Sequence, residues 1–243
     1  MHWSILLVFL ALSIIGIWVA YSFLNKNGLY LFCILASTIT ITLGSASIFS
    51  LFVPISIVVF PVVFLAMLTT LHKFGKEEAK KLFFMTLISM TCLFVCNFFE
   101  NAYLASAGNT AYLTWNALGG YISPIISFVA ASSLTLLLTS KIKVNQLKNF
   151  LKLALFVAIA SGINVVVYSI LAYTGTLSFG KIILVLLIEI FITAIVSLGL
   201  GYFEKFLNRE PKLIQEKQEE VAPAKEEPKE PSVEEIKTPE DID

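Results

Sequence analysis

The residue with the clearest chemical potential is Glu189, an acidic side chain inside the apolar run Leu186-Leu187-Ile188-Glu189-Ile190-Phe191. Placing a carboxylate at the centre of a membrane helix costs about 2.5–3.5 kcal/mol on insertion scales. We therefore expect this group to be protonated, paired or exposed to a wet cavity. A functional role, as a contact to a solute or as a proton carrier, and a structural hydrogen bond both stay open.

A second polar set occupies one face of a predicted helix. Ser161, Asn164 and Tyr168 recur at intervals of three and four residues, which places them on the same side of a helix. The Asn164 amide offers donors and an acceptor. These residues are candidates for contact with a solute, although an Asn in this setting also commonly bonds to a neighbouring helix.

A third polar set, formed by Asn97, Glu100 and Asn101, lies near the end of another apolar run. Carboxylate and amide groups at a membrane boundary can contact a solute as it enters. Interfacial anchoring by aromatic side chains is the alternative interpretation. The residues that would complete a polar, aromatic-lined mouth are Phe98, Phe99, Tyr103, Trp115 and Asn116.

The sequence lacks the motifs that would indicate an enzyme, a metal site or nucleic-acid binding. The sequence contains no His-Glu-x-x-His, no phosphate-binding glycine loop and no Gly-x-Ser-x-Gly elbow, so we expect no enzyme. There are two histidines and three cysteines, and the cysteines lie within apolar runs without His or acidic partners, so we expect no metal and no cofactor. Nothing in the sequence indicates nucleic-acid binding.

The elements that must position these residues are membrane spans. Of 243 residues, 57% are hydrophobic and 14% are charged, whereas a soluble domain carries roughly 25% charged residues. A span needs about 20 mostly apolar residues. The sequence therefore predicts an all-α, polytopic transmembrane bundle of about seven spans, with six as the alternative because the boundary near Pro54 is poorly defined. The predicted spans are 4–24, 29–51, 53–72, 82–104, 119–139, 150–173 and 181–203.

Lysines alternate between the loops. They occur in the first loop at Lys26, in the third at 73–81 and in the fifth at 141–148, whereas the loops at 51–53 and 105–118 carry none. Only Lys181 departs from the pattern. The positive-inside rule then places the N-terminus outside and the C-terminus in the cytoplasm, in the plasma (inner) membrane.

The charge balance separates a membrane body from a tail. Residues 1–207 carry 11 basic and 5 acidic residues, a net charge of +6, and residues 208–243 carry 6 basic and 12 acidic residues, a net charge of −6. The tail contains five prolines and no aromatic residue, so it cannot bury enough apolar surface to order itself. We expect a disordered acidic segment, with binding of a cytoplasmic partner as a further hypothesis.

Small and hydroxylic residues form a stripe in the second predicted span. Ser37, Thr40, Gly44 and Ser47 recur every three or four residues. Such a stripe is typical of close helix packing. Lining of a polar cavity is the functional alternative.

Two stretches of the chain resemble the queuosine precursor transporter family, also called the vitamin uptake transporter family. The first runs from Phe60-Pro61 to the loop that begins Lys73-Phe74-Gly75 and ends Lys80-Lys81. It is similar to the family's proline-phenylalanine span and its cytoplasmic loop Tyr-Gly-Lys-Lys-Glu-Ala-Arg. The resemblance covers about residues 29–203 and continues at Ser127-Phe128-Val129-Ala130 and at Tyr168-x-x-x-Ala172-Tyr173-Thr174-Gly175.

Several charged positions of that family are replaced here. Leu68 and His72 stand where it has an Asp and a Glu, and Leu134, Thr135 and Leu138 stand where its fifth span has Ser-Gln-x-x-Asp. Asn164 takes the place of an Asp in the following span.

The resemblance implies a transporter that moves a small polar, nucleobase-like solute inward and places Asn164 on the ligand side. We expect Glu189, identified from its apolar surroundings, to lie in the same pocket. The alternative is a non-transporting membrane anchor or scaffold whose tail binds a cytoplasmic partner. The lipid bilayer is the expected surrounding in either case, and a homo-oligomer stays open.

Overall fold

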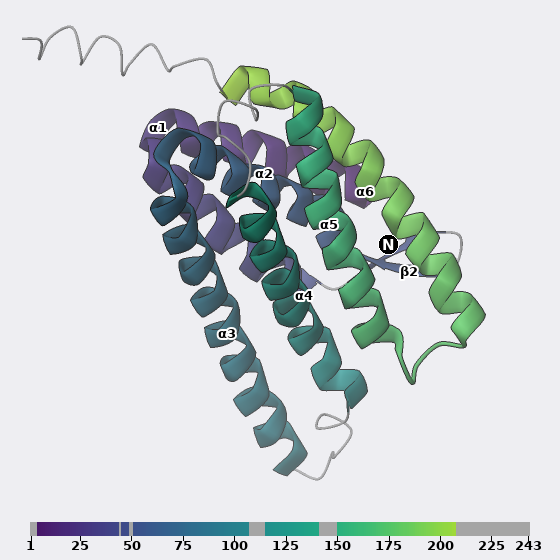
Figure 1. The fold of residues 1–243 in the computed structure, drawn as a ribbon. Coiled ribbons are helices and arrows are strands. Elements are labelled where there is room, and N and C mark those ends of the chain that lie inside the picture. Colours follow the sequence, from purple (N-terminus) through teal and green to yellow (C-terminus); the bar gives the residue numbers. More distant parts are fainter. Residues whose placement is uncertain (1–3, 44, 49–50, 107–114, 141–149, 208–243) are drawn as a thin grey trace, which may run out of the picture. The chain divides into compact units, whose positions relative to one another are not determined.

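The computed structural model describes residues 4–43, 45–48, 51–106, 115–140 and 150–207. They form six α-helices and one short β-hairpin (Figure 1). Each of these six helices is long and apolar enough to cross a membrane. The prediction of an α-helical transmembrane bundle is confirmed, and the helices are compatible with an integral membrane protein. The elements are α1 (Ser4–Leu43), β1 (Ser45–Ile48), β2 (Leu51–Pro54), α2 (Ser56–Phe74), α3 (Lys76–Ser106), α4 (Trp115–Ser140), α5 (Phe150–Tyr173) and α6 (Phe179–Leu207).

The first helix, α1, is two helical segments that fold back on each other. Its backbone leaves the helical region at Asn25, where φ is +51° and ψ is −127°, a positive φ that Asn tolerates better than most residues. A methyl group added at Gly28 would lie 1.8 Å from the carbonyl oxygen of Ala20, although eight residues of continuous helix would separate them by about 12 Å. The described part of the chain therefore contains seven helical segments of near-membrane length.

The second of these segments is shorter than the predicted span 29–51. It ends at Leu43, and β1 and β2 follow as an antiparallel pair in which Ser45 is opposite Pro54 and Ile48 is opposite Leu51. Proline disfavours helical backbone at the residue before it, which agrees with the strand conformation of Val53 before Pro54. Of the predicted small-residue stripe, Ser37 and Thr40 are buried in α1 and Ser47 lies in β1, whereas Gly44 is outside the described residues.

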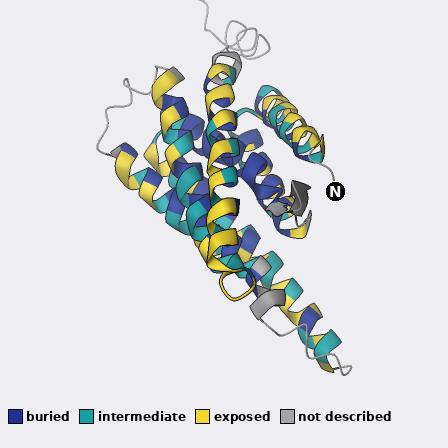
Figure 2. Ribbon diagram, turned by 90° about the vertical axis from the view of Figure 1, so that its right-hand side faces the viewer, coloured by how far each residue is buried: buried dark blue, intermediate teal, exposed yellow. Residues whose placement is uncertain are grey.

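Helix α2 is the core of the bundle. Every residue from Ser56 to Leu71 is buried, whereas the other helices alternate buried and exposed positions (Figure 2). The ring of Phe128 in α4 lies 6.0 Å from Phe60, 6.1 Å from Phe64 and 5.8 Å from Phe83 in α3, measured between centroids. Two stretches that carry the family resemblance thus meet in this aromatic cluster, where their phenylalanines pack.

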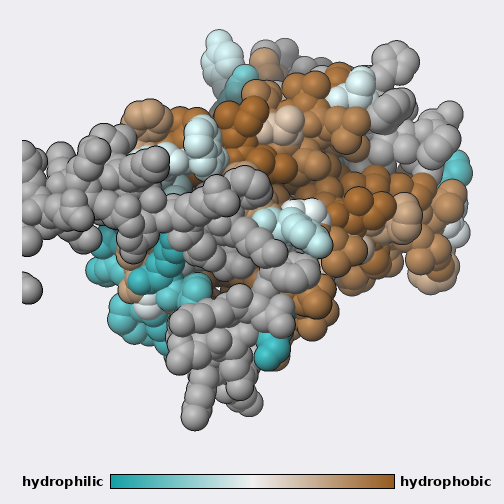
Figure 3. Space-filling model, turned by 90° about the horizontal axis from the view of Figure 1, so that it is seen from above, coloured by the Kyte–Doolittle hydropathy of each residue, from teal (hydrophilic) through white to brown (hydrophobic). Residues whose placement is uncertain are grey.

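The outer surface is apolar. Large side chains point outward on several helices, including Leu12, Phe23 and Phe191, which are 57%, 75% and 67% exposed. Figure 3 shows hydrophobic residues over much of the described surface. Exposed apolar patches of this extent are unusual for a soluble monomer, so the surface indicates a membrane-embedded protein.

The first and third predicted loops meet at one end of the bundle. Glu78, in the first turn of α3, lies 3.2 Å from the Lys26 ammonium and 2.8 Å from that of Lys81, and it accepts a hydrogen bond from the Tyr30 hydroxyl. The hydrogen bonds from Lys81, Tyr30 and Lys26 lower the pKa of Glu78 to about 2. The shared side predicted for these two loops agrees with these contacts. The lysines predicted at 141–148 and the tail 208–243 lie outside the described residues.

Candidate functional site around Glu189

Glu189 is fully buried against α5. Its side chain is 0% exposed, and its carboxylate accepts a hydrogen bond from the Ser169 hydroxyl. The Tyr173 hydroxyl lies 3.4 Å from the second carboxylate oxygen. Hydroxyl donors satisfy a carboxylate without neutralising its charge. The described ion pairs of this chain involve Glu77 and Glu78 and leave Glu189 without a basic partner.

A tight connection between α5 and α6 brings these groups together. Helix α5 ends at Tyr173, and the chain turns through Gly175, whose φ of +86° is a left-handed conformation common just after a helix end. The carbonyl oxygen of Ser178 then accepts hydrogen bonds from the amides of Lys181 and Ile182 as α6 begins. So short a turn makes α5 and α6 antiparallel neighbours, which allows Glu189 to meet residues twenty positions earlier.

Tyr173, whose hydroxyl contacts the carboxylate, packs against a second aromatic ring. Tyr168 and Tyr173 lie with centroids 6.1 Å apart and ring planes at 89°, an edge-to-face pair. Tyr168 was predicted as a site residue, and the structure places it next to the tyrosine that contacts Glu189. The resulting group of Glu189, Ser169, Tyr173 and Tyr168 is called the Glu189 cluster below.

Asn164 and Ser161 lie earlier in α5, before Ser169, and are also buried, with 3% and 1% of their surface exposed. The Asn164 side-chain oxygen and the Ser161 hydroxyl have no hydrogen-bond partner among the described residues, and neither do the hydroxyls of Thr193 and Ser197 on α6. An unsatisfied buried polar group costs about 1–3 kcal/mol. The packed pair α5 and α6 therefore carries several polar atoms that a bound molecule or water would satisfy.

Asn97, Glu100 and Asn101, the polar set predicted near the end of the span 82–104, make no described hydrogen bond or ion pair with the Glu189 cluster. Asn97 donates from its amide to the carbonyl oxygen of Leu93 at 2.9 Å, on its own helix. Glu100 is exposed and Asn101 is nearly buried, at 9%. All three lie on α3, which packs against α1, α2 and α4, so they are not brought into contact with Glu189. The side chains of Trp115 and Asn116 lie outside what the structure describes.

Sequence reasoning missed two members of the Glu189 cluster as site residues, Ser169 and Tyr173. The sequence does show that Ser169 and Tyr173 are four residues apart and therefore lie on one face of a helix. The missing information was which residues of α5 face Glu189, and that depends on how the two helices are placed along each other.

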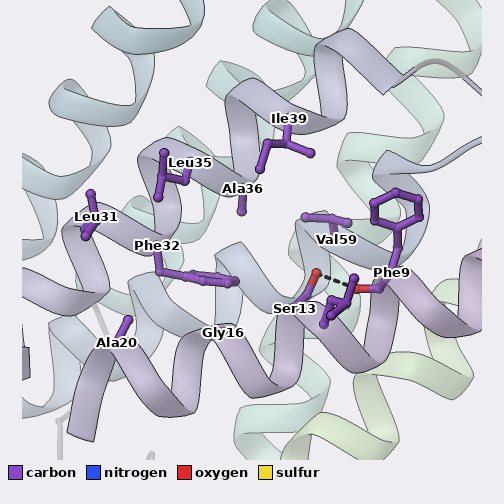
Figure 4. A pocket seen from close by; sticks show the side chains of 11 residues that line it. Phe9, Ser13, Gly16, Ala20, Leu31, Phe32, Leu35, Ala36, Ile39 and Val59 are labelled. Atoms are coloured by element: carbon purple, nitrogen blue, oxygen red, sulfur yellow. Dashed lines mark hydrogen bonds between the residues drawn. The ribbon is translucent and has the colours of Figure 1, made fainter. Parts of the chain in front are cut away.

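Two cavities are described, and both are apolar and separate from the Glu189 cluster. One, of about 280 Å³, lies between the two segments of α1 and is lined by Phe9, Phe32 and their neighbours (Figure 4). The second, of about 440 Å³, is lined by α1, α2 and α6 residues such as Leu10, Val58 and Ile195. Neither contains a predicted site residue, and their chemistry suits lipid chains more than a polar solute.

Comparison with known proteins gives no relatives. No family model, no curated protein and no solved structure matches this chain.

Proposed function

We propose that this chain is a membrane transporter for a small polar solute and that the Glu189 cluster contacts that solute. The observation that carries the proposal is a carboxylate with 0% exposure, held by two hydroxyl groups and without a basic partner among the described residues. An ionisable group kept inside a membrane bundle at such cost is typical of solute and ion pathways. The unpaired polar atoms of Asn164 and Ser161 on the adjoining helix support the same interpretation.

The solute class is a finer part of the proposal. The resemblance to queuosine precursor transporters favours a flat, polar, nucleobase-like molecule that moves inward across the plasma membrane. In that case Asn164 supplies an amide that can pair with the edge of a base. The N-terminus outside and the C-terminus in the cytoplasm belong to the same proposal, because they follow from the lysine distribution.

Uptake by variants tests this function. Glu189→Gln keeps the shape of the side chain and removes its charge, and we expect it to abolish uptake of a labelled deazaguanine base while the protein still inserts and folds. Glu77→Gln is the matched control, because it makes the same change at an exposed position on the first turn of α3. Normal uptake by Glu189→Gln would contradict the proposed role of the cluster.

The anchor alternative makes a separate prediction. Deletion of residues 208–243 should leave uptake intact if the membrane body transports a solute. If the body is only an anchor, the wild-type chain takes up no base, and the deletion removes binding of a cytoplasmic partner.

A further inference from the structure

We propose that Glu189 binds the ammonium group of an organic monocation, and that this cation exchanges with a proton on the same carboxyl group. The inference deepens the proposed function and rests on it, since it specifies the charge of the solute. It starts from a mismatch in the structure: the buried Glu189 has hydrogen-bond donors around it but no compensating positive charge among the described residues.

The described residues around Glu189 include no basic group that could provide this charge. Helix α6 packs mainly against α5, α2 and β2. The residues of α1 that share a cavity with α6 are all apolar: Leu6, Leu7, Leu10 and Ile14. The titratable residues of α5 are Tyr168 and Tyr173 beside the carboxylate, and Lys152, which is 21 positions before Tyr173 and so roughly 30 Å away along the helix. The strand β2 has no titratable residue.

Helix α2 carries its titratable side chains, His72 and Lys73, in its last turn. That turn leads into α3 at the end of the bundle opposite the α5–α6 turn (Figure 1). Within α6, Lys181 is exposed and precedes Glu189 by eight residues, about 12 Å along the axis. Tyr202, Glu204 and Lys205 are farther away toward the other end of the helix.

Tyrosine rings next to a carboxylate favour an ammonium group. The Tyr173 hydroxyl is 3.4 Å from Glu189 Oε1, and the Tyr168 ring stands at right angles to that of Tyr173. A cation over an aromatic face is attracted by the ring, and the attraction grows when water is excluded. An anionic solute would meet a second negative charge in this place, whereas a cation supplies the missing counter-charge.

The exchange balances in charge and atoms. In the empty site the Glu189 carboxyl group holds a proton, because a lone carboxylate is disfavoured where water is excluded. When the cation arrives, the O–H bond of the carboxyl breaks and the proton leaves to water, and the ammonium group takes its place beside the carboxylate. One positive charge enters and one leaves.

Three probes with one ring and different charges test the inference on the purified full-length protein in detergent: benzylammonium, benzyl alcohol and phenylacetate. We expect benzylammonium to bind and the neutral and anionic probes to bind far more weakly. Its apparent affinity should rise by up to roughly tenfold per pH unit while the site is protonated. In a weakly buffered solution, binding should release one proton per ligand.

Variants assign the effect to the carboxyl group. Glu189→Gln should lose both the binding and the proton release, and Glu77→Gln should keep both, with helical circular dichroism and gel-filtration profile reporting on folding. Tyr173→Phe keeps the ring and removes one hydroxyl, so it should bind benzylammonium with a smaller loss.

Four results would overturn the exchange site: equal binding of benzyl alcohol, absence of benzylammonium binding by the folded wild-type protein, binding without proton release, or unchanged binding by Glu189→Gln. Because binding is measured without uptake, any of them can occur while solute uptake still depends on Glu189. In that case the charge assignment fails and the proposed transport function stands.

Discussion

Two glutamates, Glu78 and Glu189, each accept a hydrogen bond from a tyrosine hydroxyl, and their surroundings otherwise differ. Glu78 lies at a helix start with two lysines within 3.2 Å and 19% of its side chain exposed. Glu189 is 0% exposed, and the hydrogen bonds that it accepts from the described residues come from the hydroxyl groups of Ser169 and Tyr173. A glutamate that bonds to a tyrosine therefore occurs twice: at Glu78 lysines balance the negative charge, and at Glu189 no described basic residue does.

The comparison teaches that the partners of a carboxylate, more than the acid itself, decide whether its charge is balanced within the protein. Lys26 and Tyr30 belong to the second segment of α1, and Glu78 and Lys81 belong to α3, so this group ties two helices together at one end of the bundle. The Glu189 cluster ties α5 to α6, yet it leaves a charge that has to be met by a proton or by a ligand.

Gly28→Ala should have the largest effect, because it removes the helix hairpin that supports the Glu78 side of the comparison. Its new methyl group would meet the Ala20 backbone at 1.8 Å, and backbone cannot move aside as a side-chain tip can. We expect a loss of about 3 kcal/mol or more in unfolding free energy, measured as loss of folded protein in detergent. Gly162→Ala is the control, because nothing lies within 4 Å of its added carbon.

Exchanging the two acids for amides should give opposite results. Glu78→Gln should lower the midpoint of thermal unfolding, because Lys26 and Lys81 lose their common partner, and uptake should persist below that temperature. Glu189→Gln should leave the midpoint unchanged or raise it, since the neutral amide removes the cost of keeping a buried carboxyl group protonated, and it should abolish uptake. If both variants change stability alike, the distinction between the two glutamates is wrong.

Acidic pH should selectively remove the contribution of Glu78 to the stability of the folded protein. Its folded-state pKa is lowered to about 2, below the ordinary value of about 4.3. Its stabilisation is therefore complete above about pH 4.3 and is lost as the pH falls toward 2. The difference in unfolding midpoint between the wild type and Glu78→Gln should shrink across that interval. A difference that stays constant would show that the lysine contacts are not the cause.

The smallest effect is expected at Lys80. Its ammonium lies 2.8 Å from Glu77, but the two side chains are 44% and 76% exposed, and exposed pairs of this kind contribute little. Lys80→Gln should leave the unfolding midpoint within experimental error. Lys81→Gln, one position later, should lower it, because the partner of Lys81 is Glu78, whose side chain is only 19% exposed, although Lys81 itself is 64% exposed.

The sequence was most informative where one residue type is costly in its surroundings. Glu189 stood out because an acid in an apolar run needs a reason, and its burial in the structure agrees with that expectation. The span prediction failed between residues 43 and 56, because hydropathy cannot separate an apolar helix from an apolar hairpin. The set at Asn97, Glu100 and Asn101 was identified by the same polarity criterion, but no described bond connects it to the Glu189 cluster.

The sequence by itself determined that this chain has membrane-length apolar segments, that an acidic residue lies within the last of them and that basic residues gather in alternate loops. These properties depend on the composition of each segment, because the hydrophobicity and charge of a segment decide by themselves whether it can cross a membrane. Only the tertiary structure decided that α1 doubles back at Asn25, that α2 occupies the core and that Ser169 and Tyr173 are the partners of Glu189. Those outcomes depend on the position of each helix along its neighbours, and a shift of one residue would turn different side chains toward the interface.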